Sequence, residues 1–156
     1  MTAVVVSRKL TLLLESQNPG DAQELADEFL LWKKKLIGPG DTFGKSSLFG
    51  KPASVVRLGL AKVHLESDAV TANWDYLLSV KKQMDPDKYT SDRVLVYGQL
   101  GDMPRQPYFL LTILEPGHEY MEDPDLVKQL APAYEKERDL YGKTLADPNW
   151  VTAGFY

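Results

Sequence analysis

The run Tyr108-Phe109-Leu110-Leu111-Thr112-Ile113-Leu114 is the stretch of sequence that decides the fold. Nearly every residue in it is apolar, which is expected for a central strand covered on both faces of a sheet. The segment Arg93–Leu100 also predicts a strand, and Gly101–Pro107 predicts the turn that joins the two. The sequence therefore predicts a sheet with these two strands in its interior.

The segments at either end of the chain predict one further strand and two helices. Ala3–Glu15 is rich in Val and Leu and predicts a strand, and Asn18–Asp21 predicts a turn that starts a helix. Ala22–Leu36 places apolar residues near helical spacing and predicts a helix. Pro124–Tyr141 predicts another helix, which Pro132 should kink or interrupt.

The middle of the chain and its tail are less regular. Thr42–Lys51 predicts a loop or a short helix, and Ser54–Glu66 predicts a strand, although its part Arg57–Lys62 could begin as a helical turn. Trp74–Leu78 predicts a short helix or an insertion that packs on the sheet. The tail Pro148–Tyr156 carries three aromatic residues and is expected to dock on the body of the protein.

Length and composition are those of an ordinary globular protein. The chain has 156 residues, of which 44% are hydrophobic and 26% charged, so residues 1–156 are expected to form a single domain. The absence of cysteine excludes disulfides and thiolate metal sites. No signal-peptide pattern and no apolar run of membrane-spanning length is present, so we predict a cytoplasmic protein without a membrane partner.

The charge is acidic overall but uneven along the chain. A net charge of −4 and a pI near 5.2 argue against a nonspecific nucleic-acid binder. The segment from Lys33 to Arg93, however, contains eleven basic and seven acidic residues, so the sequence allows a local cationic surface. Lys33, Lys34 and Lys35 end the first predicted helix, where they either complement the helix dipole or bind RNA or a partner.

The two histidines are the residues best suited to proton transfer near neutral pH. His64 lies in a predicted strand, and His118 follows the strand 108–114. Histidine is the side chain whose ordinary pKa permits this exchange, so the pair could supply a general base and a general acid. The alternative is that His64 packs in the sheet and His118 is a solvated loop residue.

Motifs of other enzyme classes are missing from the sequence. It contains no phosphate-binding loop, no glycine-rich dinucleotide fingerprint and no Gly-x-Ser-x-Gly turn of a serine hydrolase. With no cysteine and two distant histidines, a zinc site would need carboxylate ligands. We therefore expect neither a metal ion nor a small-molecule cofactor.

An ordered set of short segments between Glu24 and Arg138 resembles the YafO family of bacterial type II toxins. The segments are Phe29 with Lys33, Phe43-Gly44-Lys45, Leu48-Phe49, Val63-His64-Leu65, Leu95-Val96-Tyr97, and Leu110-Leu111-Thr112-Ile113-Leu114-Glu115-Pro116 with His118. Lys62 stands where a further histidine would be expected, and Arg93-Val94 where a more polar pair would be. The chain also extends beyond the usual end of the family, from about Leu140 to Tyr156.

The resemblance implies an α+β, RelE-like fold in which helices pack on a small antiparallel sheet. It also implies a ribosome-dependent endoribonuclease that cleaves mRNA during translation and is held inactive by a cognate antitoxin encoded beside it. The expected partners are therefore the antitoxin, the ribosome and mRNA. The alternative function is a non-enzymatic ribosome-binding or adaptor protein.

RNA can be cut without a metal ion when its own 2′-OH attacks the adjacent phosphate, which requires a base, an acid and cations. We predict His64 and His118 as the proton carriers, with Lys45 and Arg93 completing the catalytic set. The predicted RNA-binding residues are Lys33, Lys34, Lys35, Lys62 and Tyr97. Tyr97 could contact phosphate or stack on a base, or could simply be a residue of the sheet.

Overall fold

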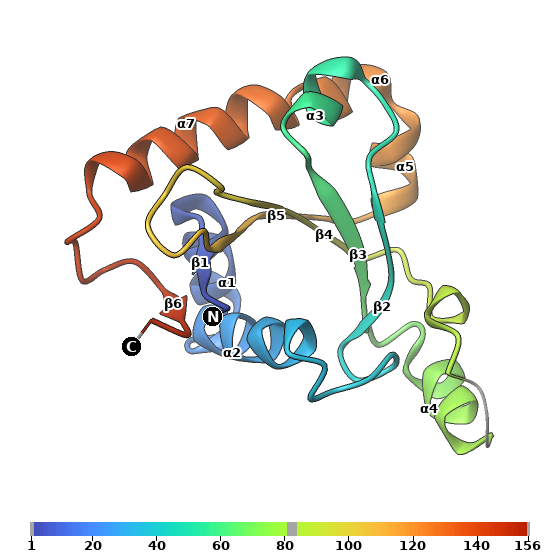
Figure 1. Ribbon diagram of the computed structural model, residues 1–156. Coiled ribbons are helices and arrows are strands. Elements are labelled where there is room, and N and C mark those ends of the chain that lie inside the picture. Colours follow the sequence, from blue (N-terminus) through green and yellow to red (C-terminus); the bar gives the residue numbers. More distant parts are fainter. Residues whose placement is uncertain (1, 81–83, 156) are drawn as a thin grey trace.

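A single sheet runs through the computed structural model, which describes residues 2–80 and 84–155 (Figure 1). Its strands are β1 (Val4–Val6), β2 (Phe43–Leu48), β3 (Ala61–Leu65), β4 (Val94–Gln99), β5 (Tyr108–Leu114) and β6 (Thr152–Ala153). Among the described residues they form six strands in the order β2-β3-β4-β5-β1-β6. All neighbouring pairs are antiparallel except β1 and β5, which run parallel.

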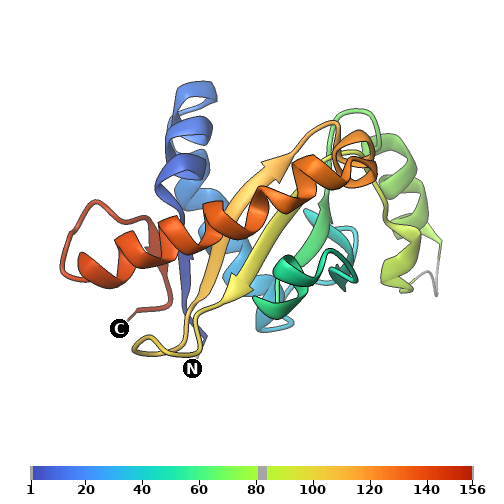
Figure 2. The same cartoon turned by 90° about the horizontal axis from the view of Figure 1, so that it is seen from above.

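Helices cover both faces of this sheet (Figure 1). They are α1 (Arg8–Gln17), α2 (Asp21–Lys33), α3 (Ala53–Arg57), α4 (Thr71–Ser79), α5 (Gly117–Glu122), α6 (Pro124–Lys128) and α7 (Leu130–Lys143), with a 3₁₀ turn η1 at Pro86–Lys88. Figure 2 shows α7 crossing over β4 and β5. The predicted α+β fold, with helices packed on a small and mostly antiparallel sheet, is confirmed.

The two faces of the sheet hold two separate cores, because side chains alternate along each strand. Leu95 and Leu110 pack with α1 and α2 on one face. Val96 and Phe109 pack with α6 and α7 on the other. The expectation that 108–114 is a central strand covered on both sides is therefore confirmed.

The predicted strand at Ala3–Glu15 is wrong beyond Val6. Ser7 ends β1 and caps α1, because its Oγ accepts a hydrogen bond from the Leu10 N–H at 3.1 Å. Leu10 and Leu14 are then buried at helical spacing. The exposed Leu12, with 72% of its surface accessible, made the run look like a continuous strand.

Two predictions in the middle of the chain also need correction. Residues 42–51 contain the edge strand β2, and residues 54–66 contain the helix α3 before the strand β3. Strand β2 contains few apolar residues because an edge strand buries few of them. The sequence therefore lacked the apolar pattern that usually predicts a strand. Gly44 permits a close approach to Tyr89, since a Cβ there would lie 2.1 Å from the Tyr89 carbonyl oxygen.

The other segments agree with expectation more closely. Strand β4 and helices α2 and α4 lie within or near the predicted ranges. The 124–141 helix is interrupted at Gln129, and Pro132 lies in the first turn of α7, where no helical N–H bond is lost.

The tail docks as expected: β6 pairs with β1, and Trp150 is buried against Tyr141 with ring centroids 5.2 Å apart. Tyr156, which the prediction for the tail included, and Lys81 and Lys82 of the basic stretch lie outside the described residues. None of the helices in the described ranges combines the length and apolar character needed to cross a membrane.

Replacing Ser7 should destabilise the fold, because its buried Oγ also donates a hydrogen bond to the Leu111 carbonyl at 2.7 Å. The Ser7→Ala variant leaves a buried carbonyl and the Leu10 N–H without this partner, and should lose about 1–3 kcal/mol of unfolding free energy in urea titrations. Ser16→Ala removes an exposed serine of the same helix and should stay within about 0.5 kcal/mol of wild type. Equal stability of the two variants would contradict this role of Ser7.

Candidate functional site

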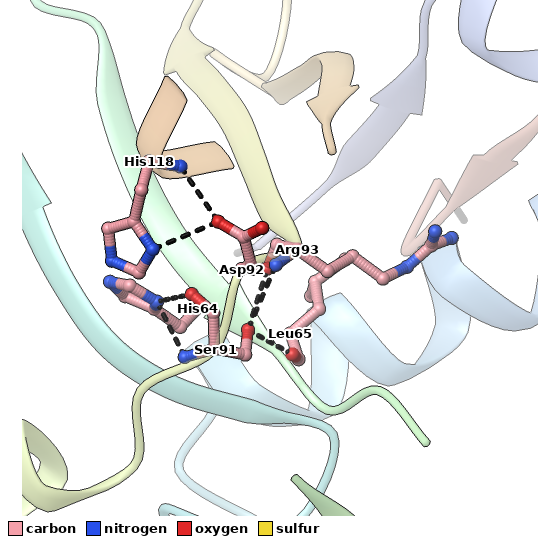
Figure 3. Close-up of polar contacts among 6 residues, drawn as sticks. All are labelled: His64, Leu65, Ser91, Asp92, Arg93 and His118. Carbon is pink, nitrogen blue, oxygen red and sulfur yellow. Dashed lines mark hydrogen bonds and ion pairs between the residues drawn. The ribbon is translucent and has the colours of Figure 1, made fainter. Parts of the chain in front are cut away.

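The structure brings the two histidines together although 54 positions separate them in sequence. His64 lies on β3, and His118 lies in the first turn of α5, with ring centroids 6.2 Å apart (Figure 3). The sheet makes this contact possible because β4 lies between β3 and β5. Val94 of β4 pairs with His64 of β3 on one side and with Leu114 of β5 on the other. The end of β5 therefore delivers α5 next to the end of β3.

Backbone groups of Ser91 hold the His64 ring. The Ser91 N–H donates to Nδ1 of His64 at 2.9 Å, and the Ser91 carbonyl oxygen lies 2.7 Å from the same nitrogen. These contacts suit different states of Nδ1: the amide can donate to a bare Nδ1, whereas the carbonyl can accept from an Nδ1–H. Only the neutral tautomer that carries its proton on Nδ1 leaves Nε2 free to accept a proton. Ser91 is itself fixed, because its buried Oγ donates to the Leu65 carbonyl at 2.6 Å.

Burial lowers the pKa of His64, whose accessible fraction is 8%. The hydrogen bond to the Ser91 backbone opposes this shift, while the nearby His118, Lys45 and Lys62 add to it. The net direction favours a neutral imidazole, which is the form that can accept a proton.

Asp92 holds the second histidine in place. Its Oδ1 lies 2.9 Å from Nδ1 of His118 and accepts the His118 backbone N–H at the same distance (Figure 3). The side chain of His118 is 63% exposed, so this carboxylate rather than burial orients the ring. With Nδ1 engaged, Nε2 is the nitrogen left to meet a substrate.

Lys45 and Lys62 lie on the same face of the sheet as His64. Lys62 is two residues before His64 on β3, so both side chains leave the strand on one side. Lys45 on β2 is close enough to lower the pKa values of both Lys62 and His64, although burial is the larger cause in each case. Two lysine side chains therefore lie near the His64 imidazole.

A cavity of about 300 Å³ begins at this cluster. Lys62, Phe49 and Met121 contribute to its lining, and Lys62 Nζ lies 4.8 Å from the centre of the Phe49 ring. The cavity thus joins a basic side chain of the cluster to apolar side chains from the segment after β2 and from α5. Among the residues that the structure describes, no three His, Asp or Glu side chains gather as metal ligands do.

Arg93 is not part of the histidine cluster. Figure 3 shows its side chain directed away from both imidazole rings. Its Nη1 lies 3.0 Å from Glu115 Oε1, and the residue lines a separate hollow with Glu28 and Glu66. Arg93 directly follows Asp92, but its side chain points in another direction and reaches Glu115 instead of the histidines.

Lys33 and Tyr97 lie on the opposite face of the sheet, under α2. Lys33 Nζ is 3.4 Å from the Tyr97 hydroxyl and 4.6 Å and 4.8 Å from the ring centres of Trp32 and Tyr108. Burial lowers the pKa of Lys33 and raises that of Tyr97. Tyr97 is therefore a buried residue of the sheet. The Lys33 ammonium group lies among aromatic rings.

Lys34 and Lys35, by contrast, are exposed beyond the end of α2. Lys33, by comparison, is half-buried. The structure thus separates Lys33 from the two residues that follow it.

Ser91 and Asp92 are the site residues that the sequence interpretation missed. Each contacts a histidine 26 or 27 positions away, so no local spacing connects them. The only local signal is that they directly precede a clear strand, at a place where polar side chains often hold a chain end.

A family model described as toxin YafO of a type II toxin–antitoxin system matches residues 30–138. The chain belongs to the YafO toxin family. The matched range contains every candidate site residue from Lys33 to His118, and the resemblance inferred from the sequence is confirmed. Neither the curated proteins nor the solved structures that were searched gave a match. A type II toxin implies a protein antitoxin as its partner.

The lowered pKa of His64 should make stability depend on pH in one direction. Because the folded pKa lies below the unfolded value of about 6.5, the unfolded chain binds the proton more readily. Wild type should therefore lose unfolding free energy as the pH falls through about 6.5, and His64→Gln should lose less. Urea titrations between pH 8 and pH 5 measure this difference. Tyr76→Gln, which changes an exposed residue of α4, should keep the wild-type slope, and equal slopes for wild type and His64→Gln would contradict the assignment.

Proposed function

We propose that this YafO-family protein is a ribosome-dependent endoribonuclease that cleaves mRNA during translation without a metal ion. The observation that carries the proposal is the meeting of two separately tethered histidines beside Lys45 and Lys62. Such a set provides the two proton carriers and the cations that cleavage by the RNA's own 2′-OH requires. The site of action is then the cytoplasm, where ribosomes and mRNA meet.

His64 is the proposed general base. Its lowered pKa favours the neutral ring. In the tautomer whose Nδ1–H donates to the Ser91 carbonyl, Nε2 takes the proton from the 2′-OH as that oxygen attacks the adjacent phosphorus. A bond forms between the 2′-oxygen and phosphorus, and the bond from phosphorus to the 5′-oxygen breaks. The products are a 2′,3′-cyclic phosphate and a free 5′-hydroxyl.

His118 is the proposed general acid that gives a proton to the leaving 5′-oxygen. Asp92 keeps Nδ1 engaged at 2.9 Å, so Nε2 faces outward from an exposed ring. The carboxylate also balances the charge of the ring while it carries two protons. With the ring centres 6.2 Å apart, a phosphodiester between them could form hydrogen bonds of ordinary length, about 2.7–3.2 Å, to both.

Lys45 and Lys62 are proposed to stabilise the negative charge that develops on the phosphorane. Both lie on the histidine face of the sheet, and Lys62 also borders the 300 Å³ cavity, which is a reasonable place for a neighbouring base. For Arg93 to act as a phosphate clamp, its guanidinium would have to leave Glu115 and turn toward the imidazoles. We therefore place Lys62 in the catalytic set and give Arg93 a smaller role.

The ribosome is proposed to supply the RNA affinity that the toxin lacks. The cationic cluster is small, and the whole chain has a pI near 5.2. A ribosome that already holds the mRNA removes the need for a long basic surface on the toxin. Lys34 and Lys35, exposed beyond α2, are the proposed contacts to ribosomal phosphates.

Cleavage should depend on translation. In a cell-free system, the protein should produce new primer-extension stops on mRNA that is being translated and should leave the same RNA intact when ribosomes are omitted. Robust cutting of naked RNA would rule out ribosome dependence. Arrest of translation with intact mRNA would instead support the alternative of a non-enzymatic ribosome-binding protein.

The histidine variants test the catalytic assignment in the same assay. His64→Ala and His118→Ala should each lower the cleavage rate about 10²–10⁴-fold, the usual loss for one general acid or base. Asp92→Asn should lower it less, because Asp92 orients His118 without contacting the substrate. Arg93→Gln should also lose less than either histidine variant, and an equal loss would return Arg93 to the catalytic set. Full activity of both histidine variants would overturn the acid–base assignment.

A further inference from the structure

A groove of about 470 Å³ lies between α1 and α7, away from the histidine cluster. Its floor is formed by the consecutive residues Leu111, Thr112, Ile113 and Leu114 of β5. Leu114 packs into the core beneath α7, whereas Ile113 packs against the core beneath α1 and α2. A hollow that touches residues from both faces of a strand lies along the edge of that strand.

This edge of β5 has no strand partner among the described residues. Of the residues of β5, β1 pairs with Tyr108–Leu110 alone, because the chain leaves the sheet at Ser7 to begin α1. The other edge of 112–114 is occupied, because β4 pairs with these residues. A free strand edge presents backbone N–H and C=O groups that can pair with another extended chain.

The walls of the groove are apolar and exposed. Leu12 from α1 and Leu140 from α7 have 72% and 41% of their surfaces accessible, and Tyr120 from α5 also lines the groove. Exposed apolar side chains that line one groove indicate a surface that is covered by a partner. Because α5 also carries His118, an occupant that touches Tyr120 reaches the helix of the proposed acid.

The rim of the groove carries positive charge that is not neutralised internally. Lys9 and Lys136 are exposed and form no ion pair with any described residue. Arg8 is engaged with Asp147, and the buried Glu137 accepts the Lys9 backbone N–H. The free charges at the rim therefore complement an acidic partner.

We propose that an extended segment of the antitoxin, with apolar and acidic side chains, adds to the sheet as a strand along Thr112–Leu114. Its backbone would pair with the free edge, its apolar side chains would contact Leu12 and Leu140, and its carboxylates would meet Lys9 and Lys136. The proposal rests on the type II toxin family and not on the proposed nuclease activity. Cleavage and antitoxin binding can therefore fail independently.

Binding can be measured with full-length toxin and the purified product of the flanking reading frame that suppresses its toxicity. Leu12→Glu combined with Leu140→Glu should raise Kd at least tenfold, because it places carboxylates in an apolar groove meant for an acidic segment. Lys9→Glu combined with Lys136→Glu changes only exposed residues, so it tests the groove even if the first variant folds poorly. It should also weaken the salt dependence of Kd. Tyr76→Glu on α4 is the matched control and should bind as wild type does.

Amide hydrogen exchange distinguishes a strand from other occupants. Adding the antitoxin should protect the edge-facing amides of Thr112–Leu114 from exchange. Both groove variants should still cleave mRNA at the wild-type rate. An unchanged Kd for both groove variants would overturn the proposal. Weaker binding without amide protection would also overturn it, because a docked helix would then be the occupant. A stable toxin dimer that buries the same amides without antitoxin would show that a second copy of the chain fills the groove.

Discussion

The hydrogen bonds made by Ser91 and Asp92, just before β4, determine where both histidines lie. Ser91 uses its backbone to hold His64 and its buried hydroxyl to hold β3, while Asp92 holds the first turn of α5 and the ring of His118. Buried polar groups without partners are costly, so this short segment and the ends of β3 and β5 are fixed together. The site is therefore a consequence of how the central strands begin and end.

Much of the sheet could be predicted from sequence because burial on both faces leaves a strong pattern. Strand β5 is apolar at almost every position, and β4 is nearly so. Edge strand β2 carries little apolar signal, and the leucines of α1 were ambiguous because Leu12 is exposed in a groove rather than buried. The errors therefore lie at the sheet edge and at the groove between α1 and α7, where the exposure of a side chain does not follow from the local sequence pattern.

The candidate site was predictable by residue type but not by arrangement. The two histidines could be identified because few other side chains transfer protons near neutral pH. Their tethers could not, because Ser91 and Asp92 act across 26 or 27 positions. Lys33 shows the same limit: its sequence neighbours suggest a solvated helix end, but aromatic rings from α2, β4 and β5 surround its ammonium group. Helical spacing cannot reveal rings that come from other elements.

The edges of the sheet differ in how their backbone groups are covered. At the β2 edge, the Lys45 N–H donates to the Tyr89 carbonyl at 2.9 Å, so the segment after η1 covers the strand. At the other edge, β6 has two residues and pairs with β1. In the described ranges, the second half of β5 instead remains open on one side, between leucines that the fold leaves exposed. Proteins usually block such an edge. An open edge next to the helix that carries His118 fits the proposal that a strand of the antitoxin extends the sheet and inhibits the toxin.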